Sequence, residues 1–179
     1  MKNHLITFVF LLVFISLKGQ SFNLGAKFQK THSLYWENGI SAQYSFASFK
    51  SDQFYLGFDY LTSRLGSAIS SNALKQDNFI ASFGWHFRKD KAFRIITKLN
   101  LGLFKADLEE EIFSELPSST TLISPEIALS YQLKSLPIII NLGSGFNANI
   151  FDGGKSPGTQ QPLYYHLSFY YSLTKETIQ

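Results

Sequence analysis

The stretch Leu163-Tyr164-Tyr165-His166-Leu167-Ser168-Phe169-Tyr170-Tyr171-Ser172-Leu173 decides the fold, because its side chains alternate in character. Every second residue from Leu163 to Leu173 is large and apolar or aromatic, whereas His166, Ser168 and Ser172 share the other face. A period of two is typical of a β-strand, whose successive side chains point to opposite faces. The stretch therefore predicts a strand with one apolar and one polar face.

The same alternation recurs in earlier segments of the chain. These segments are Phe22–Gln29, Ile40–Phe49, Gln53–Leu61, Asn78–Phe87, Phe93–Phe104, Thr121–Leu133 and Pro137–Ile150. Most are close to the ~9–11 residues with which a tilted strand crosses a bilayer. Pro125 lies inside one of them, and because proline cannot donate to a strand ladder, it predicts a bulge.

The less apolar face carries the more informative residues. It consists mainly of glycines, serines and amides, with a few charged or titratable side chains: Lys27, Asp59, Arg94, Lys98, Glu126 and His166. Small residues fit the narrow interior of an eight-stranded barrel, and the apolar face then meets lipid. We therefore predict an all-β protein, an eight-stranded antiparallel up-and-down transmembrane β-barrel with a polar, side-chain-filled interior. The charged residues are expected to pair there as a network that plugs the lumen.

Long and short connections alternate between these segments. The long ones are Lys30–Gly39, Thr62–Asp77, Lys105–Thr120 and Phe151–Pro162, and the short ones are Lys50–Asp52, Arg88–Ala92 and Lys134–Leu136. Outer-membrane barrels have long outside loops and short periplasmic turns. Aromatic residues near both ends of the strands, such as Trp85, Phe104 and Tyr164, are expected at the two membrane interfaces.

Residues 1–20 read as a cleaved secretory signal peptide: Lys2, then an apolar run from Leu5 to Ile15, then Gly19. The barrel would then span residues 21–173, followed by a short tail, 174–179. Removing Lys2 and Lys18 leaves 14 basic against 13 acidic residues, so the formal charge falls from +3 to about +1. This balance gives no reason to expect a nucleic-acid partner. The absence of cysteine excludes disulfides and thiolate sites.

The chain resembles the small eight-stranded outer-membrane β-barrel proteins of Gram-negative bacteria, the OmpA/OmpX-like group, over Ser21–Leu173. The resemblance rests on the strand pattern, and it departs from the group at the C-terminus, which lacks a terminal aromatic residue. It implies an outer-membrane location, contact with membrane lipid and lipopolysaccharide, and insertion by the outer-membrane assembly machinery.

His166-Leu167-Ser168 is the one element of catalytic type, because residues two apart share a strand face and an imidazole can activate a hydroxyl. It is similar to the His-x-Ser element of PagL-type lipid A deacylases, although Phe169 stands where that family commonly has asparagine. The predicted register turns His166 and Ser168 to the lumen, away from lipid. A hydrogen-bonded interior histidine is the alternative interpretation.

The third long loop contains Asp107, Glu109, Glu110, Glu111 and Glu115. These carboxylates can hold a divalent cation, but Leu108, Ile112 and Leu116 favour a short amphipathic helix with a solvated acidic face. No cofactor or metal is assigned. The main hypothesis is a non-enzymatic barrel with an envelope structural or surface-contact role through four outside loops. A lipid A hydrolase using Ser168 and His166 and a soluble periplasmic lipocalin-like carrier are the alternatives, and the external partner stays unknown.

Overall fold

The computed structural model describes residues 20–31, 36–68, 71–108, 118–149 and 162–174, and these fold as β-strands joined by turns. The strands are β1 (Ser21–Thr31), β2 (Trp36–Phe49), β3 (Asp52–Ala68), β4 (Ser71–Phe87), β5 (Phe93–Leu108), β6 (Ser119–Gln132), β7 (Ile138–Phe146), β8 (Ala148–Asn149) and β9 (Leu163–Ser172). The expected signal peptide lies outside the described residues, except for Gln20, and so do most of the acidic loop and its expected helix.

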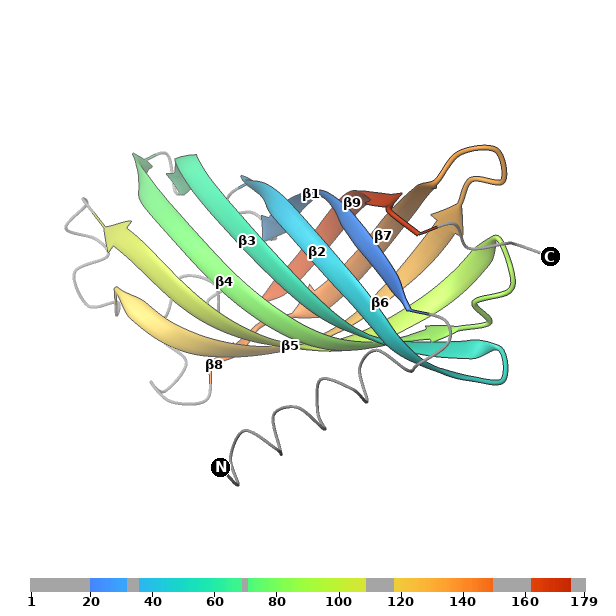
Figure 1. Cartoon of the computed structure of the whole chain (residues 1–179). Helices are drawn as coiled ribbons and strands as arrows, with labels where there is room; N and C mark the ends of the chain where they lie inside the picture. Colours follow the sequence, from blue (N-terminus) through green and yellow to red (C-terminus); the bar gives the residue numbers. More distant parts are fainter. Residues whose placement is uncertain (1–19, 32–35, 69–70, 109–117, 150–161, 175–179) are drawn as a thin grey trace, which may run out of the picture.

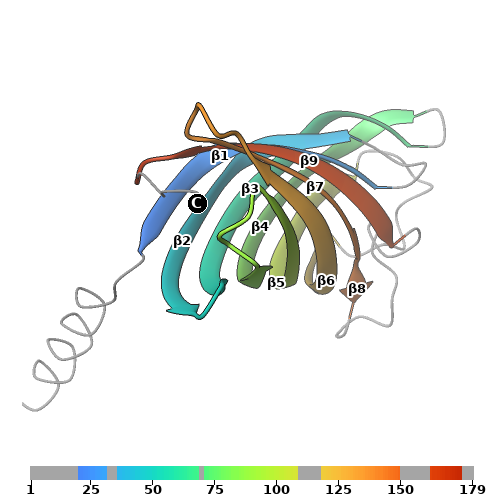
Figure 2. The same cartoon turned by 90° about the vertical axis from the view of Figure 1, so that its right-hand side faces the viewer.

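The strands form a closed antiparallel barrel (Figure 1). From β1 to β7 each strand pairs with the next one in the sequence, β9 pairs with β7, and β9 also returns to pair with β1. β7 and β8 both pair with β6, one after the other along its length, and so count as one strand of the wall. The barrel therefore has eight strands. Figure 2 shows the strands curving around a common axis, with β1 beside β9. The predicted fold is confirmed.

The two faces of the strands are distributed as the alternation predicts. Large apolar side chains stay on the outer wall: Leu99 is 55% exposed, Leu129 53% and Phe169 41%. Most of the buried inward side chains are polar, and the exceptions include Tyr55, Ile96 and Phe104. An outer band of this size and character is suited to lipid, because facing water it would form a large aggregation-prone patch.

The connections differ from the prediction at the long-loop end. Thr62–Asp77 was expected to be a loop, but β3 and β4 pair through most of it, from Thr62↔Asp77 to Ala68↔Ser71. The alternating apolar pattern stops near Leu61 because the pairs beyond it, such as Ser63↔Gln76, are polar. The short turns remain short, and Lys50 and Arg88 adopt left-handed backbone with φ of 53° and 56°.

Two smaller expectations also differ. Pro125 pairs with Leu99 in a regular register with β5, whereas β2 has a register shift against β3 between Ser45 and Ala47. On its other side, the ladder is interrupted at Asn147, between β7 and β8. Phe104 and Tyr164 face the interior and are 1% and 2% exposed, so their expected place at the membrane interface is wrong.

Large inward side chains lie opposite glycines. Tyr55 pairs with Gly84, and Tyr164 and His166 pair with Gly145 and Gly143. A Cβ at any of these three glycines would overlap the ring across from it. The glycines therefore give the interior room for three rings that a barrel of eight strands could not otherwise hold.

Candidate functional site

The interior is layered along the barrel axis, and β5 gives the order of the layers. Its inward residues run from Arg94 at the short-turn end through Ile96, Lys98 and Asn100 to Phe104 near the long-loop end. Ile96 packs with Tyr55 and Ala128, and Phe104 packs with Ala106 and Leu122. Two apolar layers thus bracket a charged layer at the level of Lys98.

Four side chains form the charged layer. Lys27 Nζ lies 2.9 Å from Asp59 Oδ2, and Lys98 Nζ lies 2.9 Å from Glu126 Oε1. Two longer contacts close the ring, at 3.7 Å from Lys27 to Glu126 and 3.9 Å from Lys98 to Asp59. Two positive and two negative charges therefore balance one another. A buried charge is tolerated when it is paired in this way.

Hydrogen bonds hold both carboxylates of this layer. Tyr164 donates its hydroxyl to Glu126 Oε2 at 2.8 Å, and Asn100 Nδ2 donates to the same oxygen at 3.2 Å. Ser41 donates to Asp59 Oδ1 and lies 2.7 Å from the hydroxyl of Tyr170. Residues from six strands are thus joined in one network across the lumen. Such a network fills the space that a channel would need.

His166 and Ser168 belong to the same network. His166 Nε2 lies 2.5 Å from Glu126 Oε1, and His166 Nδ1 lies 3.1 Å from Ser168 Oγ. The order carboxylate, imidazole, hydroxyl is that of a hydrolase triad. However, Ser168 is 0% exposed and points into the barrel, as the alternation predicts. A lipid ester on the outer wall is therefore separated from this hydroxyl by the wall itself.

Arg94 is buried but lies in a different layer, near the short turns. It donates from Nε to the carbonyl of Lys91 at 3.0 Å and from Nη2 to Gln132 Oε1. The structure therefore brings Lys27, Asp59, Lys98, Glu126 and His166 together and places Arg94 apart from them.

Sequence reasoning missed a second polar cluster, around Glu37. Gln29, Gln76 and Asn78 donate their amide groups to the Glu37 carboxylate in the interior. The signal was present, because Glu37, Gly39 and Ser41 follow the same period of two. It was lost because the expected strand began at Ile40, whereas β2 begins at Trp36.

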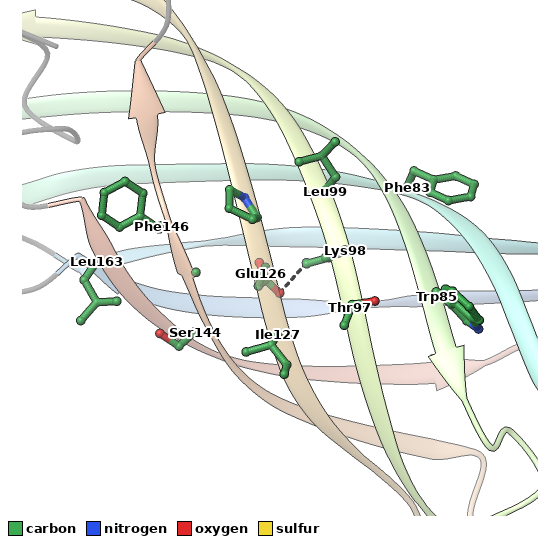
Figure 3. A pocket seen from close by; sticks show the side chains of 12 residues that line it. Phe83, Trp85, Thr97, Lys98, Leu99, Glu126, Ile127, Ser144, Phe146 and Leu163 are labelled. Carbon is green, nitrogen blue, oxygen red and sulfur yellow. Dashed lines mark ion pairs between the residues drawn. The ribbon is translucent and has the colours of Figure 1, made fainter.

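A wide groove lies on the outer wall rather than in the lumen (Figure 3). This groove of about 620 Å³ crosses β4 to β7 and β9, and apolar side chains dominate its lining, including Phe83, Trp85, Leu99, Ile127, Phe146 and Leu163. Figure 3 shows Lys98 and Glu126 paired behind it. The groove is part of the apolar outer band.

The barrel matches solved structures in shape but not in sequence. Ail, the attachment invasion locus protein of Yersinia pestis, superposes with a TM-score of 0.53 at 13% identity, over 86% of this chain and 97% of Ail. The chain has the fold of the small outer-membrane β-barrels. Neisserial surface protein A gives 0.52 at 12% identity, over 87% of this chain and 96% of its own. The outer membrane protein OprG from Pseudomonas aeruginosa gives a TM-score of 0.52 at 11% identity, over 89% of this chain and 98% of OprG.

Sequence comparison alone identifies nothing, because no family model and no curated protein matches the chain. Among the described residues, no group of three acidic, histidine or cysteine side chains is arranged to hold a metal ion. The described residues also contain no helix long and apolar enough to cross a membrane.

Proposed function

We propose that the chain is a non-enzymatic β-barrel protein of the bacterial outer membrane, with an envelope structural or surface-contact role through its four outside loops. The observation that carries this proposal is the opposition between an apolar outer wall and an ion-paired interior. A wall of this kind needs lipid, and a lumen crossed by Lys27, Asp59, Lys98 and Glu126 leaves the loops as the free surface for contact. Lipid, lipopolysaccharide and the assembly machinery are its expected partners.

The third long loop differs in charge from a surface that binds polyanions. Ail has been solved in complex with the heparin analogue sucrose octasulfate. In this chain the third long loop carries Glu109, Glu110, Glu111 and Glu115, which would repel a sulfated ligand. We therefore expect a contact partner that is neutral or cationic, or one that divalent cations bridge to these carboxylates.

The location and orientation can be tested by labelling, because the chain has no cysteine of its own. Ser118→Cys lies at the long-loop end, and Ser135→Cys lies in a short turn; both serines are exposed. A membrane-impermeant maleimide should label Ser118→Cys on intact cells, and Ser135→Cys only after permeabilisation. Recovery of the protein in the soluble periplasm, or the reverse labelling pattern, would contradict the proposal.

Removing loops then distinguishes an envelope structural role from a surface-contact role. A variant lacking residues 109–117 and 150–161 keeps all the described strands. In a deletion strain, an envelope structural role predicts raised permeability to a hydrophobic dye, restored by both the whole chain and the shortened variant. A surface-contact role predicts that only the whole chain restores attachment. A deletion strain with no change in either property would contradict both roles.

The two alternatives have less support. A lipid A hydrolase needs its nucleophile at the lipid-facing wall, whereas Ser168 is buried in the interior. A carrier of apolar ligands needs an apolar interior, whereas the interior here contains two ion pairs and their hydrogen-bonded partners.

A further inference from the structure

The three short turns of the barrel are basic, and the long connections are acidic. Residues 50–52, 88–92 and 134–136 contain five basic side chains and two acidic ones, a net charge of +3. The four long connections together contain five basic and eight acidic residues, a net charge of −3. The basic residues of the turns are Lys50, Arg88, Lys89, Lys91 and Lys134, and all of them except the half-buried Lys89 are exposed. We call these five side chains the basic turn surface.

Hydrogen bonds join the three turns to one another. The backbone nitrogen of Lys89 donates to the carbonyl of Ser51 at 2.6 Å, which connects the β2–β3 turn to the β4–β5 turn. The backbone nitrogen of Gln132 donates to the carbonyl of Ala92 at 2.9 Å, which connects the β4–β5 turn to the end of β6, where the third turn begins. The basic side chains therefore belong to one continuous surface.

The two acidic residues leave most of this positive charge without a partner. Asp52 accepts a hydrogen bond from the backbone nitrogen of Arg88 at 3.1 Å, and Asp90 lies 3.6 Å from the ammonium group of its neighbour Lys91. Among the described residues, no acidic side chain forms an ion pair with Lys50, Arg88 or Lys134. Each of the three turns thus presents one exposed positive charge that the protein itself does not neutralise.

Exposed aromatic side chains border the basic turn surface. Phe49 is 65% exposed, and Lys50 Nζ lies 5.6 Å from the centre of its ring. Phe93 is 66% exposed and packs against Tyr131, with ring centroids 5.0 Å apart. Rings at the end of a lipid-facing wall lie at the level of the lipid headgroups. Because the turns are short, their basic side chains lie at that level as well.

We propose that the basic turn surface binds the headgroups of anionic phospholipids in the leaflet that surrounds the short turns. A headgroup with a net negative charge, such as phosphatidylglycerol, supplies the charge that Lys50, Arg88 and Lys134 lack. A zwitterionic headgroup such as phosphatidylcholine carries a cation of its own and gains less. That this leaflet is the periplasmic one rests on the proposed function, whereas the binding itself does not depend on the orientation of the barrel in the cell.

Native mass spectrometry tests the proposal by counting the lipids that stay bound to the whole chain. The protein is folded in detergent micelles that contain equal amounts of phosphatidylglycerol and phosphatidylcholine with the same acyl chains. Phosphatidylglycerol should be preferred by roughly fivefold, the factor that one lysine or arginine near an anionic surface supplies.

Two triple variants locate the binding. Lys50→Gln/Arg88→Gln/Lys134→Gln removes one charge from each turn and should reduce the preference to near onefold. Lys30→Gln/Lys75→Gln/Lys105→Gln is the matched control, because it removes the same number of charges at the long-loop end and should keep the wild-type preference. A difference in gel migration before and after boiling checks that both variants fold.

Three outcomes would overturn the proposal: a wild type that binds the two lipids equally, a turn variant that keeps the preference, and equal losses in the two variants. A wild type without lipid preference that sediments with purified peptidoglycan, and does so only when Lys50, Arg88 and Lys134 are present, would assign the surface to peptidoglycan instead. Failure of the proposed function is distinguishable from all of these, because the labelling of Ser118→Cys and Ser135→Cys on cells reports the orientation alone.

Discussion

Tyr164 on β9 lies directly opposite Gly145 on β7, and its hydroxyl donates to Glu126 Oε2 at 2.8 Å. The glycine leaves space for the ring, and the ring reaches the charged layer. The packing of the wall and the pairing of the buried charges are therefore connected through one side chain.

Gly145→Ala should destabilise the barrel by about 1–3 kcal/mol, because the added methyl group meets the Tyr164 ring and neither strand can move freely. Urea unfolding in lipid vesicles measures this. Gly102→Ala is the control, since its nearest atom, Ile80 Cγ1, would lie at an ordinary contact of 3.4 Å. It should change the free energy of unfolding by less than about 0.5 kcal/mol. Equal losses in the two variants would contradict the importance of the Tyr164–Gly145 pair.

Lys27→Met should cost about 3–5 kcal/mol of unfolding free energy, because it leaves Asp59 with its other cation, Lys98, only at 3.9 Å. The double variant Lys27→Met/Asp59→Asn should lose less than the sum of its single variants, with a coupling of about 0.5–3 kcal/mol. The exposed pair of Lys75 and Asp107 is the comparison, and Asp107→Asn should cost at most about 1 kcal/mol. Strict additivity of the two buried changes would show that the pair does not act as a unit.

Leu99→Arg should cost about 2–4 kcal/mol in lipid vesicles, because Leu99 lies near the middle of β5 on the outer wall. Leu136→Arg, in a short turn, should cost at most about 1 kcal/mol, since that position is near the interface. Both leucines are about half exposed, so the comparison isolates depth in the bilayer. Similar small losses in both variants would argue against a lipid-facing wall.

Ser168→Ala should leave the acyl chains of lipid A unchanged, because the Ser168 hydroxyl is enclosed with His166 inside the barrel. Mass spectrometry of lipid A from a deletion strain carrying the wild type, the variant or an empty vector measures this. All three samples should be identical. An acyl chain that is missing only when Ser168 is intact would establish the hydrolase instead.

The local properties of the fold could be predicted from the sequence. The period of two gives the strands and their two faces, since each side chain's direction depends only on its neighbours along the chain. The ends of the strands were harder to predict, because Ser63 and Gln76 pair beyond the point where the apolar residues stop.

The contacts inside the barrel could not be predicted, because they depend on the register between strands. Lys27, Asp59 and Glu126 come from β1, β3 and β6, and their meeting depends on how far each strand is shifted along its neighbour when the barrel closes. The same shift places Gly145 opposite Tyr164 and brings Gln76 to Glu37. That shift could not be inferred from a single sequence.

The β3–β4 hairpin has a consequence for what can reach this protein from outside. Each of its strands has 17 residues, against the ~9–11 that cross a bilayer at a tilt of about 45°. The ribbon therefore continues for roughly 20 Å along the strands past the hydrocarbon region, which is a height of about 14 Å. In the orientation proposed above, the paired part of this ribbon rises above the lipid surface on the outside of the cell. A protein that approaches the cell would, in that orientation, meet this ribbon before it meets the lipid surface.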